Sequence, residues 1–456
     1  MTSELIDWQS VLGPLFDGFG ADELQALECA IHVHPRRGIR LAPDRDVSEL
    51  PFDVESVPWY ATGYLLADND VRPGAFLHYA AGDYYIQDAG SLLALALGDI
   101  QPGQMVCDTC ASPGGKSTGV LERLDGSGLL LSNEVIGSRL ALLKLSLSRT
   151  GYCNHLTTNL DLETLSSHLP QEFDCVIVDA PCTGQSMVAR GKQSMAAYSQ
   201  SQIEHSSARQ LRIIRAASEL VKPGGRLVYS TCTFAFAENE HIVSQLLLEQ
   251  SEWNLQRYPE LSTWESPGFP GCYRLWPHRD PTAGAFAAAL IRDSDGTTAR
   301  EQSASKTTRA PRRYDWQRVD QLPQSVDWLT GAWHANVNPP VQLYRRGHEL
   351  HGFPVDCPAD WLNIAISGVP LAEWKGDRIQ PLYGASLLKS STSANARQLD
   401  LDDQQASRFV GGEAIRIEHT LAAGWTVVTW RQRPLGWGKV SGGMLKNHYP
   451  KLLRQP

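Results

Sequence analysis

The sequence has no long hydrophobic run. Its longest apolar stretch, LLALALG at 92–98, is far shorter than the ~20 residues that a helix needs to cross a bilayer. The first residues, MTSELIDWQS, lack the positive charge and the apolar segment of a secretion signal. Only nine cysteines are scattered over 456 residues, which does not resemble a disulfide framework. We therefore expect a cytoplasmic protein, in a reducing compartment and without membrane contact.

Positive charge is also scarce. The chain has 41 lysines and arginines against 50 aspartates and glutamates, a net charge of -9. This argues against a protein that coats nucleic acid by bulk attraction, although a local basic patch can still bind RNA. No repeat of ~20–50 residues is visible, so solenoids and propellers are not expected. The length allows two to four domains, each with its own core.

The middle of the chain alternates strand-like and helix-like stretches between about 105 and 292. The strand-like stretches are MVCDTC, GLLLSNE, NHLTTN, FDCVIVDA, GGRLVYSTCTF and GAFAAALIR. Amphipathic segments such as SRLALLKLSLSR lie between them, and LVKPGG at 220–225 is typical of a helix end followed by a turn. Such alternation predicts an α/β fold with a mainly parallel, doubly wound, Rossmann-like sheet.

Composition divides the rest of the chain. Residues 293–313 are polar and rich in serine and threonine, which predicts a linker. Residues 1–85 are expected to form a mixed α+β region with an RNA-binding or accessory role, and 86–292 the main domain. Beyond the linker, 314–384 predicts an intermediate domain and 385–456 a small, partly β domain with stretches such as AIRIEH and WTVVTWRQR.

The segment CDTCASPGGKST at 107–118 allows several interpretations. It is no phosphate-binding P-loop, because Cys110 replaces the first glycine of that pattern. Cys107 and Cys110 have no second ligand pair at zinc spacing, so no metal site is predicted. A redox dithiol is disfavoured, because a continuing strand would point the two thiols to opposite faces. What remains is a tight Gly-Gly turn into a helix, which lets backbone N–H groups approach a ligand.

Acidic residues follow the next three strand-like stretches. Glu134 ends LLLSNE, about 20 positions after the glycine turn, where an acid can accept both hydroxyls of a ribose. Asp161 follows TTNL, and Asp179 ends the stretch VIVD. Each acid alone would more often be a solvated strand-end residue. Suitable groups at consecutive strand ends favour a nucleoside cofactor.

Two cysteines also stand at strand ends. Cys182 follows Asp179 in DAPCTG, and Cys232 lies in LVYSTCTF. A single buried cysteine is more often inert packing. Adjacent strand ends can bring both thiols into one cleft, which favours chemistry. From the residues alone, Cys182 could be a nucleophile, a helper or a buried thiol.

The motifs CDTCASPGGKST, SNE, TTNLD, DAPCTG and LVYSTCTF, in this order, closely resemble the NSUN (Nol/Nop/Sun) RNA cytosine-5 methyltransferases. The resemblance covers about 30 to 292, from HPRRGIRL through YYIQDAGSLLALAL. The C-terminal PLGWGKVSGGMLKNHYPKLLR further resembles the bacterial branch that methylates small-subunit ribosomal RNA and carries a PUA-like RNA-binding domain. It implies a class I methyltransferase domain with S-adenosyl-L-methionine as cofactor.

The resemblance also implies a role for each matching residue. Cys232 would be the nucleophile, Cys182 the general base that allows product release, and Asp179 a contact to both the cytosine and the cofactor. Glu134 would hold the ribose and Asp161 the adenine. The loop around the cofactor's methionine part would comprise Cys110, Ala111, Ser112, Pro113, Gly114, Gly115 and Lys116.

The need for two thiols follows from the reaction. Carbon 5 of cytosine is a poor nucleophile, so a thiolate must first add to carbon 6 and form an enamine. After methyl transfer a proton must leave carbon 5 before the enzyme's own bond can break, and this step needs a base. One thiol can begin the cycle and the other can end it.

The last segment, 431–456, combines cations and aromatic residues without an acid. It predicts an RNA contact through phosphate binding and base stacking, although a solvated basic tail is the alternative. We expect a monomer that methylates 16S ribosomal RNA, within or outside the small subunit. A tRNA methyltransferase and a non-catalytic ribosome-assembly factor on the same fold are the alternatives. The cations and aromatic residues in question are Arg431, Arg433, Trp437, Lys439, Lys446, His448, Tyr449, Lys451 and Arg454, together with Trp430 directly before the segment.

Overall fold

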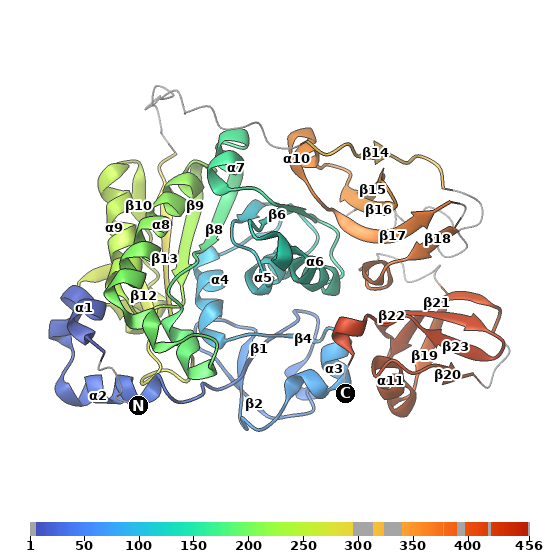
Figure 1. Ribbon diagram of the computed structural model, residues 1–456, viewed down its shortest axis with the longest axis horizontal. Coiled ribbons are helices and arrows are strands. Elements are labelled where there is room, and N and C mark those ends of the chain that lie inside the picture. The colour runs from blue at the N-terminus through green and yellow to red at the C-terminus, as the bar shows by residue number, and fades with distance from the viewer. Residues whose placement is uncertain are drawn as a thin grey trace.

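The computed structural model describes residues 6–294, 313–322, 340–376, 378–389, 397–417 and 421–454. Within these ranges the chain forms four sheets (Figure 1). The large central sheet and its helices lie beside the N-terminal helices and above a small N-terminal sheet. The two C-terminal sheets lie one above the other on the opposite side of the molecule, as Figure 1 shows.

The N-terminal region contains short helices and a four-stranded antiparallel sheet of order β2-β3-β1-β4. Its elements are α1 (Trp8–Leu12), α2 (Ala21–Ala30), β1 (Gly38–Leu41), β2 (Val54–Ser56), β3 (Gly63–Leu66), α3 (Leu77–Ala80) and β4 (Tyr84–Ile86). The guanidinium of Arg40 on β1 is fully buried, donates to both carboxylate oxygens of Glu122 at 2.6 and 2.9 Å, and donates to the carbonyl of Gly115 at 2.7 Å. The N-terminal sheet is therefore tied to the helix that begins at Gly115.

The central sheet has the strand order β11-β12-β13-β9-β8-β5-β6-β7, and β10 pairs with β13. Strands β5 to β9 run parallel, whereas β13 is antiparallel to β9. The predicted mainly parallel α/β fold is confirmed. The strands and helices of this region are α4 (Leu92–Gly98), β5 (Met105–Asp108), α5 (Gly115–Leu124), β6 (Leu129–Asn133), α6 (Leu140–Arg149), β7 (His155–Thr158), α7 (Leu162–His168), β8 (Phe173–Asp179), α8 (Gln200–Ser218), β9 (Val221–Thr231), α9 (Glu240–Glu249), β10 (Trp253–Leu255), β11 (Glu265–Ser266), β12 (Phe269–Leu275) and β13 (Ala285–Arg292).

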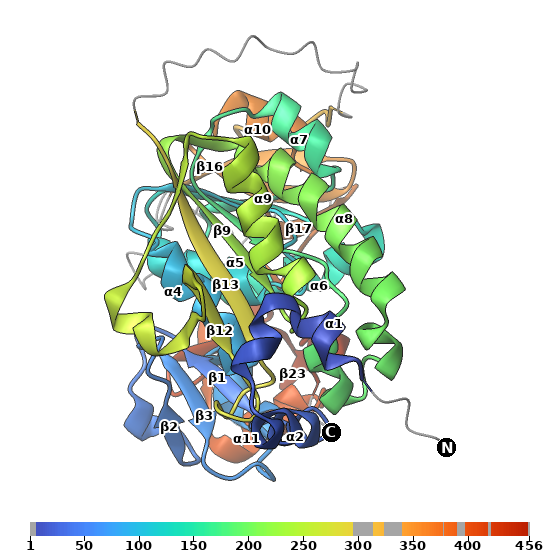
Figure 2. The ribbon, with the colours of Figure 1, turned by 90° about the vertical axis from the view of Figure 1, so that its left-hand side faces the viewer.

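Helices cover both faces of this sheet (Figure 2). Side chains alternate along each strand, so Val176 and Val178 of β8 pack with α7, α8 and α9, while Cys175 and Ile177 pack with α4, α5 and α6. A strand buried on both faces must be apolar throughout. The central part of this stretch, CVIV at 175–178, meets this requirement, whereas Asp174 and Asp179 are only partly buried. The apolar centre is why the strand could be recognised from the sequence.

The LVKPGG segment differs from the prediction of a helix end and a turn before the strand. Helix α8 ends at Ser218, but β9 already begins at Val221 and pairs with Phe173 before its register with β8 shifts. Gly224 adopts a φ of 76° within the irregular part. Strand pairing on both sides of the glycines makes the expected turn a bulge inside β9.

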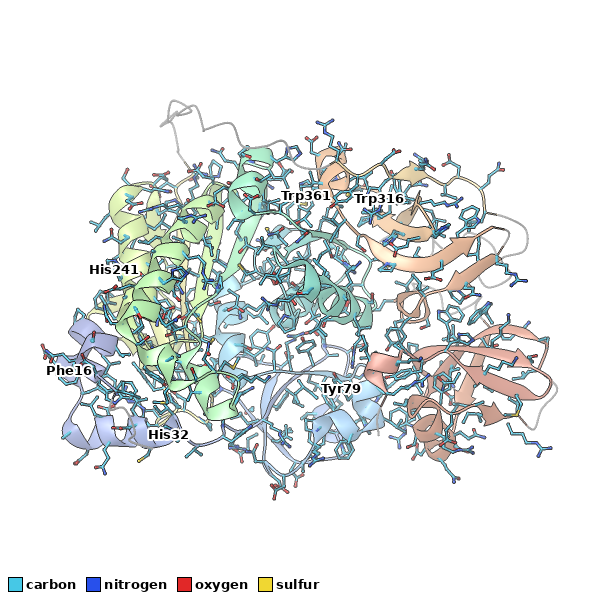
Figure 3. All side chains as sticks on the ribbon, viewed as in Figure 1. Phe16, His32, Tyr79, His241, Trp316 and Trp361 are labelled. Carbon is cyan, nitrogen blue, oxygen red and sulfur yellow. The ribbon has the colours of Figure 1, made fainter. Side chains whose placement is uncertain are left out.

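A third sheet, of order β14-β15-β16-β17-β18, covers the β7 edge of the central sheet. Thr157 on β7 donates its N–H to the carbonyl of Ser367 at 2.8 Å and accepts the N–H of Ile366 at 2.8 Å. Trp361, labelled with Trp316 in Figure 3, packs 4.8 Å from the ring of Phe173. The elements are β14 (Gln317–Arg318), β15 (Val341–Arg346), β16 (Glu349–Pro354), α10 (Ala359–Ile364), β17 (Val369–Lys375) and β18 (Arg378–Pro381).

The fourth sheet, of order β19-β21-β22-β23-β20, packs against the N-terminal region. Arg433 forms an ion pair with the buried Asp83 at 2.6 Å and a second one with Glu49. The elements are β19 (Gln398–Leu401), α11 (Asp403–Val410), β20 (Ile415–Arg416), β21 (Gly424–Trp430), β22 (Arg433–Ser441) and β23 (Met444–Asn447).

The domain boundaries at 85, 292, 313 and 384 remain proposals. One sheet lies in each proposed domain, except that β4 extends to Ile86. Most of the predicted linker, 295–312, lies outside the described residues. Among those that are described, no helix has both the length and the apolar character to cross a bilayer.

Candidate active site

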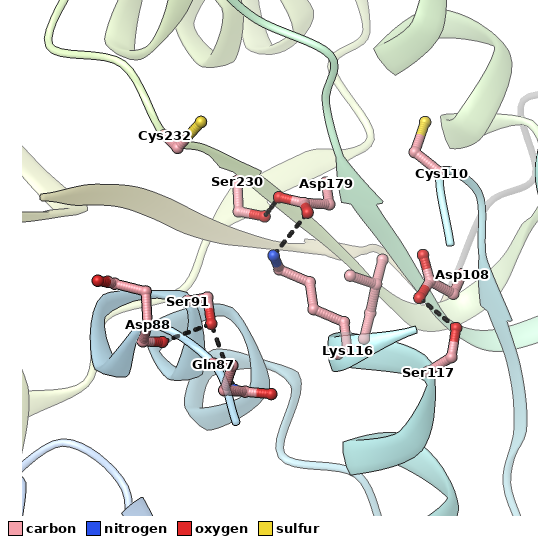
Figure 4. A network of polar contacts seen from close by, with 12 residues as sticks. Gln87, Asp88, Ser91, Asp108, Cys110, Lys116, Ser117, Asp179, Ser230 and Cys232 are labelled. Atoms are coloured by element: carbon pink, nitrogen blue, oxygen red, sulfur yellow. Dashed lines mark hydrogen bonds and ion pairs between the residues drawn. The ribbon is translucent and has the colours of Figure 1, made fainter. Parts of the chain in front are cut away.

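The carboxyl ends of five parallel strands surround a cavity of about 550 Å³. Parallel sheets of this kind place their ligands at that edge, where successive strands end side by side. Residues that follow β5, β6, β7, β8 and β9 all contribute to the lining, and Figure 4 shows part of it. Five of the predicted strand-end side chains line this cavity together, namely Glu134, Asp161, Asp179, Cys182 and Cys232.

The predicted glycine turn connects β5 to α5. Strand β5 ends at Asp108, so Cys107 is buried in the core while Cys110 lines the cavity. Gly114 has a φ of 111°, and a Cβ atom there would come within 2.7 Å of the Cβ of Ser146. A side chain at this position would meet both a strained backbone and α6. The glycine turn is therefore fixed by its neighbours as well as by its conformation.

The seven loop residues divide into two groups. Cys110, Ser112 and Lys116 line the cavity. Ala111, Pro113, Gly114 and Gly115 do not line it but form the turn that carries those three side chains. The second group can contribute through its backbone, as expected for a turn that lets a ligand approach closely.

Lys116 and Asp179 form an ion pair at the cavity. Lys116 Nζ lies 2.7 Å from Asp179 Oδ2, and Ser230 donates its hydroxyl to Asp179 Oδ1 at 3.1 Å (Figure 4). The Lys116 side chain is only 10% exposed, whereas that of Asp179 is 42% exposed. Lys116 and Ser230 thus fix the Asp179 carboxylate, which remains accessible from the cavity.

Glu134 has one carboxylate oxygen without a hydrogen-bond partner. Oε1 accepts the N–H of Ile136 at 2.8 Å, and Arg139 lies 3.4 Å from Oε2, too long for a good hydrogen bond. The residue is 2% exposed. A buried carboxylate oxygen without a donor is costly, and a ribose hydroxyl would supply that donor. The predicted ribose position thus fits the group that it would hold.

Asp161 has a structural role that the sequence prediction did not include. Its two carboxylate oxygens accept the backbone N–H and the hydroxyl of Thr164, both at 2.8 Å, and cap the N-terminus of α7. A carboxylate oxygen retains a further lone pair, so the cap does not prevent an adenine contact. That contact remains a proposal.

The two thiols lie next to each other on the loops that follow β8 and β9. Cys182 Sγ lies 3.3 Å from Cys232 Sγ, and both cysteines are free. The thiol of Cys182 donates to Cys232 and thereby lowers the pKa of Cys232, with Ser186 and Lys116 acting in the same direction. The same hydrogen bond, together with burial, raises the pKa of Cys182. The direction of the two shifts makes Cys232 the more acidic thiol of the pair and Cys182 the less acidic one.

Three polar residues of the site were given no role by the sequence. Asp88 forms an ion pair with Arg190 at 2.5 Å, and both line the cavity. Asp108 accepts the hydroxyl of Ser117 at 2.6 Å, and burial raises its pKa to about 6. Asp88 lies in YYIQDAGS, and its partner Arg190 is 102 residues away in the sequence. Asp108 lies in CDTC, and its partner Ser117 stands in the same motif, CDTCASPGGKST.

The C-terminal basic segment differs from the prediction. Trp430, Trp437 and Tyr449 are at most 3% exposed, because they pack in the cores of the two C-terminal sheets, and Arg433 is used in ion pairs. The prediction that these aromatic residues stack on bases is wrong. The described part of the chain contains no group of three or more histidine, cysteine or acidic side chains that could hold a metal ion.

Comparison with known proteins gives two family matches. The model of "16S rRNA methyltransferase RsmB/F" matches residues 94–291, and that of "Methyltransferase RsmF PUA domain" matches 396–455. The protein named ribosomal RNA small subunit methyltransferase F from Erwinia tasmaniensis is 32% identical over 466 residues, which cover 95% of this chain and 93% of that protein.

Two solved structures share the fold. A methyltransferase homologue from Pyrococcus horikoshii is 26% identical, with a TM-score of 0.53, over 64% of this chain and 100% of its own. NSun6 from the same organism, solved with SFG, is 17% identical, with a TM-score of 0.54, over 62% of this chain and 98% of its own. The second likeness concerns the fold alone.

Proposed function

The chain belongs to the RsmB/F family of 16S rRNA methyltransferases, and we propose that it methylates carbon 5 of a cytosine through a covalent adduct with Cys232. It is an RNA methyltransferase that uses S-adenosyl-L-methionine. The observation that carries the proposal is the 3.3 Å contact between Cys182 and Cys232 beside the Lys116–Asp179 pair. Methylation at a nucleophilic nitrogen or oxygen would need no such pair of thiols.

The cavity fits the cofactor at several points. In the part of the chain that the structure describes, Glu134 Oε2 accepts no hydrogen bond, and a ribose hydroxyl would supply the missing donor. The turn at Gly114 lets the backbone approach closely, and Asp161 faces the same cavity. When bound, S-adenosyl-L-methionine supplies an electrophilic methyl group. The residues proposed to hold it are Cys110, Ala111, Ser112, Pro113, Gly114, Gly115, Lys116, Glu134, Asp161 and Asp179.

Cys232 begins the reaction in this mechanism. Its thiolate adds to carbon 6 of the cytosine, which makes carbon 5 the nucleophilic end of an enamine. Asp179 accepts a hydrogen bond from the cytosine amino group, where charge changes during addition. Lys116 and Ser230 fix the orientation of that carboxyl group, since each contacts one of its oxygens. Preorganised contacts of this kind require no rearrangement during the reaction.

Cys182 ends the reaction by accepting the proton from carbon 5. In the free enzyme the negatively charged Cys232 raises the pKa of Cys182, both through their hydrogen bond and through its charge. Once Cys232 Sγ is bonded to carbon 6, that charge is gone and the pKa of Cys182 falls. The thiol then loses its proton to solvent more readily, and the resulting thiolate takes up the proton of carbon 5. Elimination then breaks the bond from Cys232 to carbon 6 and releases methylated cytosine.

RNA is proposed to contact an exposed surface on the fourth sheet. Trp425, Lys439 and Lys446 are direct neighbours on strands β21, β22 and β23, and His448 lies 4.5 Å from the Trp425 ring. We call these four residues the tryptophan–lysine patch. The exposed lysines supply phosphate contacts, and the accessible part of the half-buried Trp425 ring offers a surface on which a base can stack.

The substrate is proposed to be 16S ribosomal RNA of the small subunit, methylated in the cytoplasm by a monomer. This choice rests on the names of the relatives. The test measures 5-methylcytosine by bisulfite sequencing in RNA from cells with and without the gene. Purified protein is then given naked 16S RNA, assembled small subunits and tRNA. A new methylcytosine in 16S RNA is expected, whereas its appearance in tRNA alone would contradict the proposal.

A further inference from the structure

The residues that follow the two cysteines bond to the same carboxylate. Thr183, next to Cys182, donates its hydroxyl to Glu238 Oε1 at 2.6 Å and its N–H to Glu238 Oε2 at 3.0 Å. Thr233, next to Cys232, donates its hydroxyl to Glu238 Oε1 at 3.2 Å. The two threonine hydroxyls lie 2.9 Å apart. One side chain therefore joins the loop after β8 to the loop after β9.

Glu238 is itself held in place. It is fully buried, and Gln210 on α8 donates to Oε2 at 2.9 Å and to the carbonyl of Pro181 at 3.2 Å. The hydroxyl of Tyr229 donates to the backbone carbonyl of Glu238 at 2.7 Å. Each carboxylate oxygen thus accepts two hydrogen bonds, and these partly offset burial, which raises the pKa of Glu238.

The side chain of Asn239, which follows Glu238, bonds only to the loop that carries Cys232 and not to the loop of Cys182. Asn239 is fully buried, accepts the hydroxyl of Thr231 at 2.5 Å and donates to the carbonyl of Thr233 at 2.9 Å. Neither Glu238 nor Asn239 lines the cavity. Their bonds go to the residues on either side of the thiols, so neither is placed to touch cytosine or cofactor.

We propose that Glu238 is a positioning residue that fixes the Cys182 and Cys232 thiols at contact distance by anchoring both of their loops to one carboxylate. Two thiols on separate loops need such an anchor, because an error of 1 Å would break a sulfur contact of 3.3 Å. This deepens the proposed function, since the thiols are its nucleophile and base. The juxtaposition itself does not depend on any methyl transfer.

The geometry can be measured without the reaction. Diamide takes two electrons from a pair of thiols, which form a sulfur–sulfur bond and lose two protons to the reduced diamide. In the unaltered protein we expect fast formation of the bond between Cys182 and Cys232, detected by mass spectrometry of the peptides. In Glu238→Gln an N–H group replaces one acceptor and faces donors, so we expect oxidation to slow at least tenfold.

Two further variants separate reach from charge. Glu238→Asp keeps the charge but is one methylene shorter, so it cannot reach both threonines and should oxidise as slowly as Glu238→Gln. Thr183→Val removes one hydroxyl with little change in volume and should slow the oxidation less. The control is Glu249→Gln on α9, whose carboxylate pairs with Arg215 at the surface. Cofactor binding measures whether each variant is folded and should stay within twofold.

Methylation adds a second readout. In Glu238→Gln we expect kcat to fall at least tenfold while KM for RNA and for S-adenosyl-L-methionine stays unchanged. An oxidation rate within twofold of the unaltered protein in folded Glu238→Gln would overturn the inference, as would equal slowing in Glu249→Gln. Failure of the proposed function is distinguishable, because Cys232→Ala would then retain methylation whatever the oxidation rates are.

Discussion

Lys116 Nζ lies 2.7 Å from Asp179 Oδ2, which joins the first turn of α5 to the end of β8. The ion pair therefore couples the position of the loop proposed to hold the cofactor to that of the carboxylate proposed to contact the cytosine. A change in either side chain should affect the reaction more strongly than the binding of either molecule.

We expect Asp179→Asn to lower the methylation rate by about 10²-fold. The amide keeps the size of the side chain but loses the negative charge that orients Lys116, and it misplaces a donor opposite Ser230. Tritium transfer from labelled cofactor to RNA measures the rate. Asp320→Asn, at an exposed ion pair with Arg318, serves as the control. A full rate in Asp179→Asn would show that the carboxylate does not take part.

The two cysteines should give opposite phenotypes. In Cys182→Ala, methyl transfer occurs but the proton stays on carbon 5, so a protein–RNA adduct should survive denaturing gel electrophoresis. In Cys232→Ala, neither the adduct nor the methylated product should form. The exposed Cys29→Ala provides the matched control. Retained activity in Cys232→Ala would mean that the nucleophile lies elsewhere.

Glu134→Gln should weaken cofactor binding about tenfold, which corresponds to ~1.4 kcal/mol. Among the described residues the buried Oε2 accepts no hydrogen bond and has only Arg139 at 3.4 Å. A hydrogen bond from a ribose to a charged acceptor is stronger than one to an amide. Isothermal titration with S-adenosyl-L-methionine measures the change. The exposed Glu204→Gln on α8 should bind as tightly as the unaltered protein. Equal affinities in both variants would remove Glu134 from the cofactor site.

Burial lowers the pKa of His155 to about 4, and this makes stability depend on pH. Below its ordinary pKa of about 6.5, the unfolded chain takes up a proton that the folded chain refuses, so stability falls as the pH drops toward 4. The loss reaches about 3 kcal/mol. Asp108, with a pKa of about 6, acts in the opposite direction over the same range.

The contribution of His155 to the pH dependence of stability can be measured with a variant. His155→Leu removes the titrating group from β7, so the free energy of unfolding should fall less between pH 7 and pH 4 than in the unaltered protein. Urea unfolding at several pH values measures the difference. His205→Leu on α8 is the control. Parallel curves for the unaltered protein and His155→Leu would mean that His155 is not the group responsible.

The tryptophan–lysine patch should control the salt dependence of RNA binding. Replacing Lys439 and Lys446 by alanine removes two phosphate contacts, so the slope of log K against log salt should become shallower by about 1.4. Fluorescence anisotropy with labelled 16S RNA measures it at several salt concentrations. The control is Lys222→Ala. Lys222 forms an ion pair with Asp174 near the start of β8, at the end away from the candidate site, so its loss should leave the slope unchanged. An unchanged slope in the double variant would place the RNA elsewhere.

The strand ends and their acids could be predicted because the signals are local. VIVDAPC at 176–182 contains both the end of the buried strand and the aspartate that ends it, and the two glycines of the Gly-Gly turn indicate a tight turn by themselves. The partners could not be predicted. Arg190 and Asp88 are separated by 102 residues, and only packing brings them together. Burial of Trp437 and Tyr449 likewise depends on which sheet covers which, so their pattern was misread as a nucleic-acid surface.

The bridge between Thr157 and Ser367 has a consequence for dissecting the protein. Strand β7 is the last of the central sheet, and the third sheet satisfies its backbone while Trp361 covers Phe173. A fragment that stops at 292 would keep every residue of the candidate site and lose this cover. It would present unpaired N–H and carbonyl groups beside an apolar surface, a combination that promotes edge-to-edge aggregation. The third sheet thus protects the edge of the catalytic sheet from pairing with another chain and so keeps that sheet from aggregating.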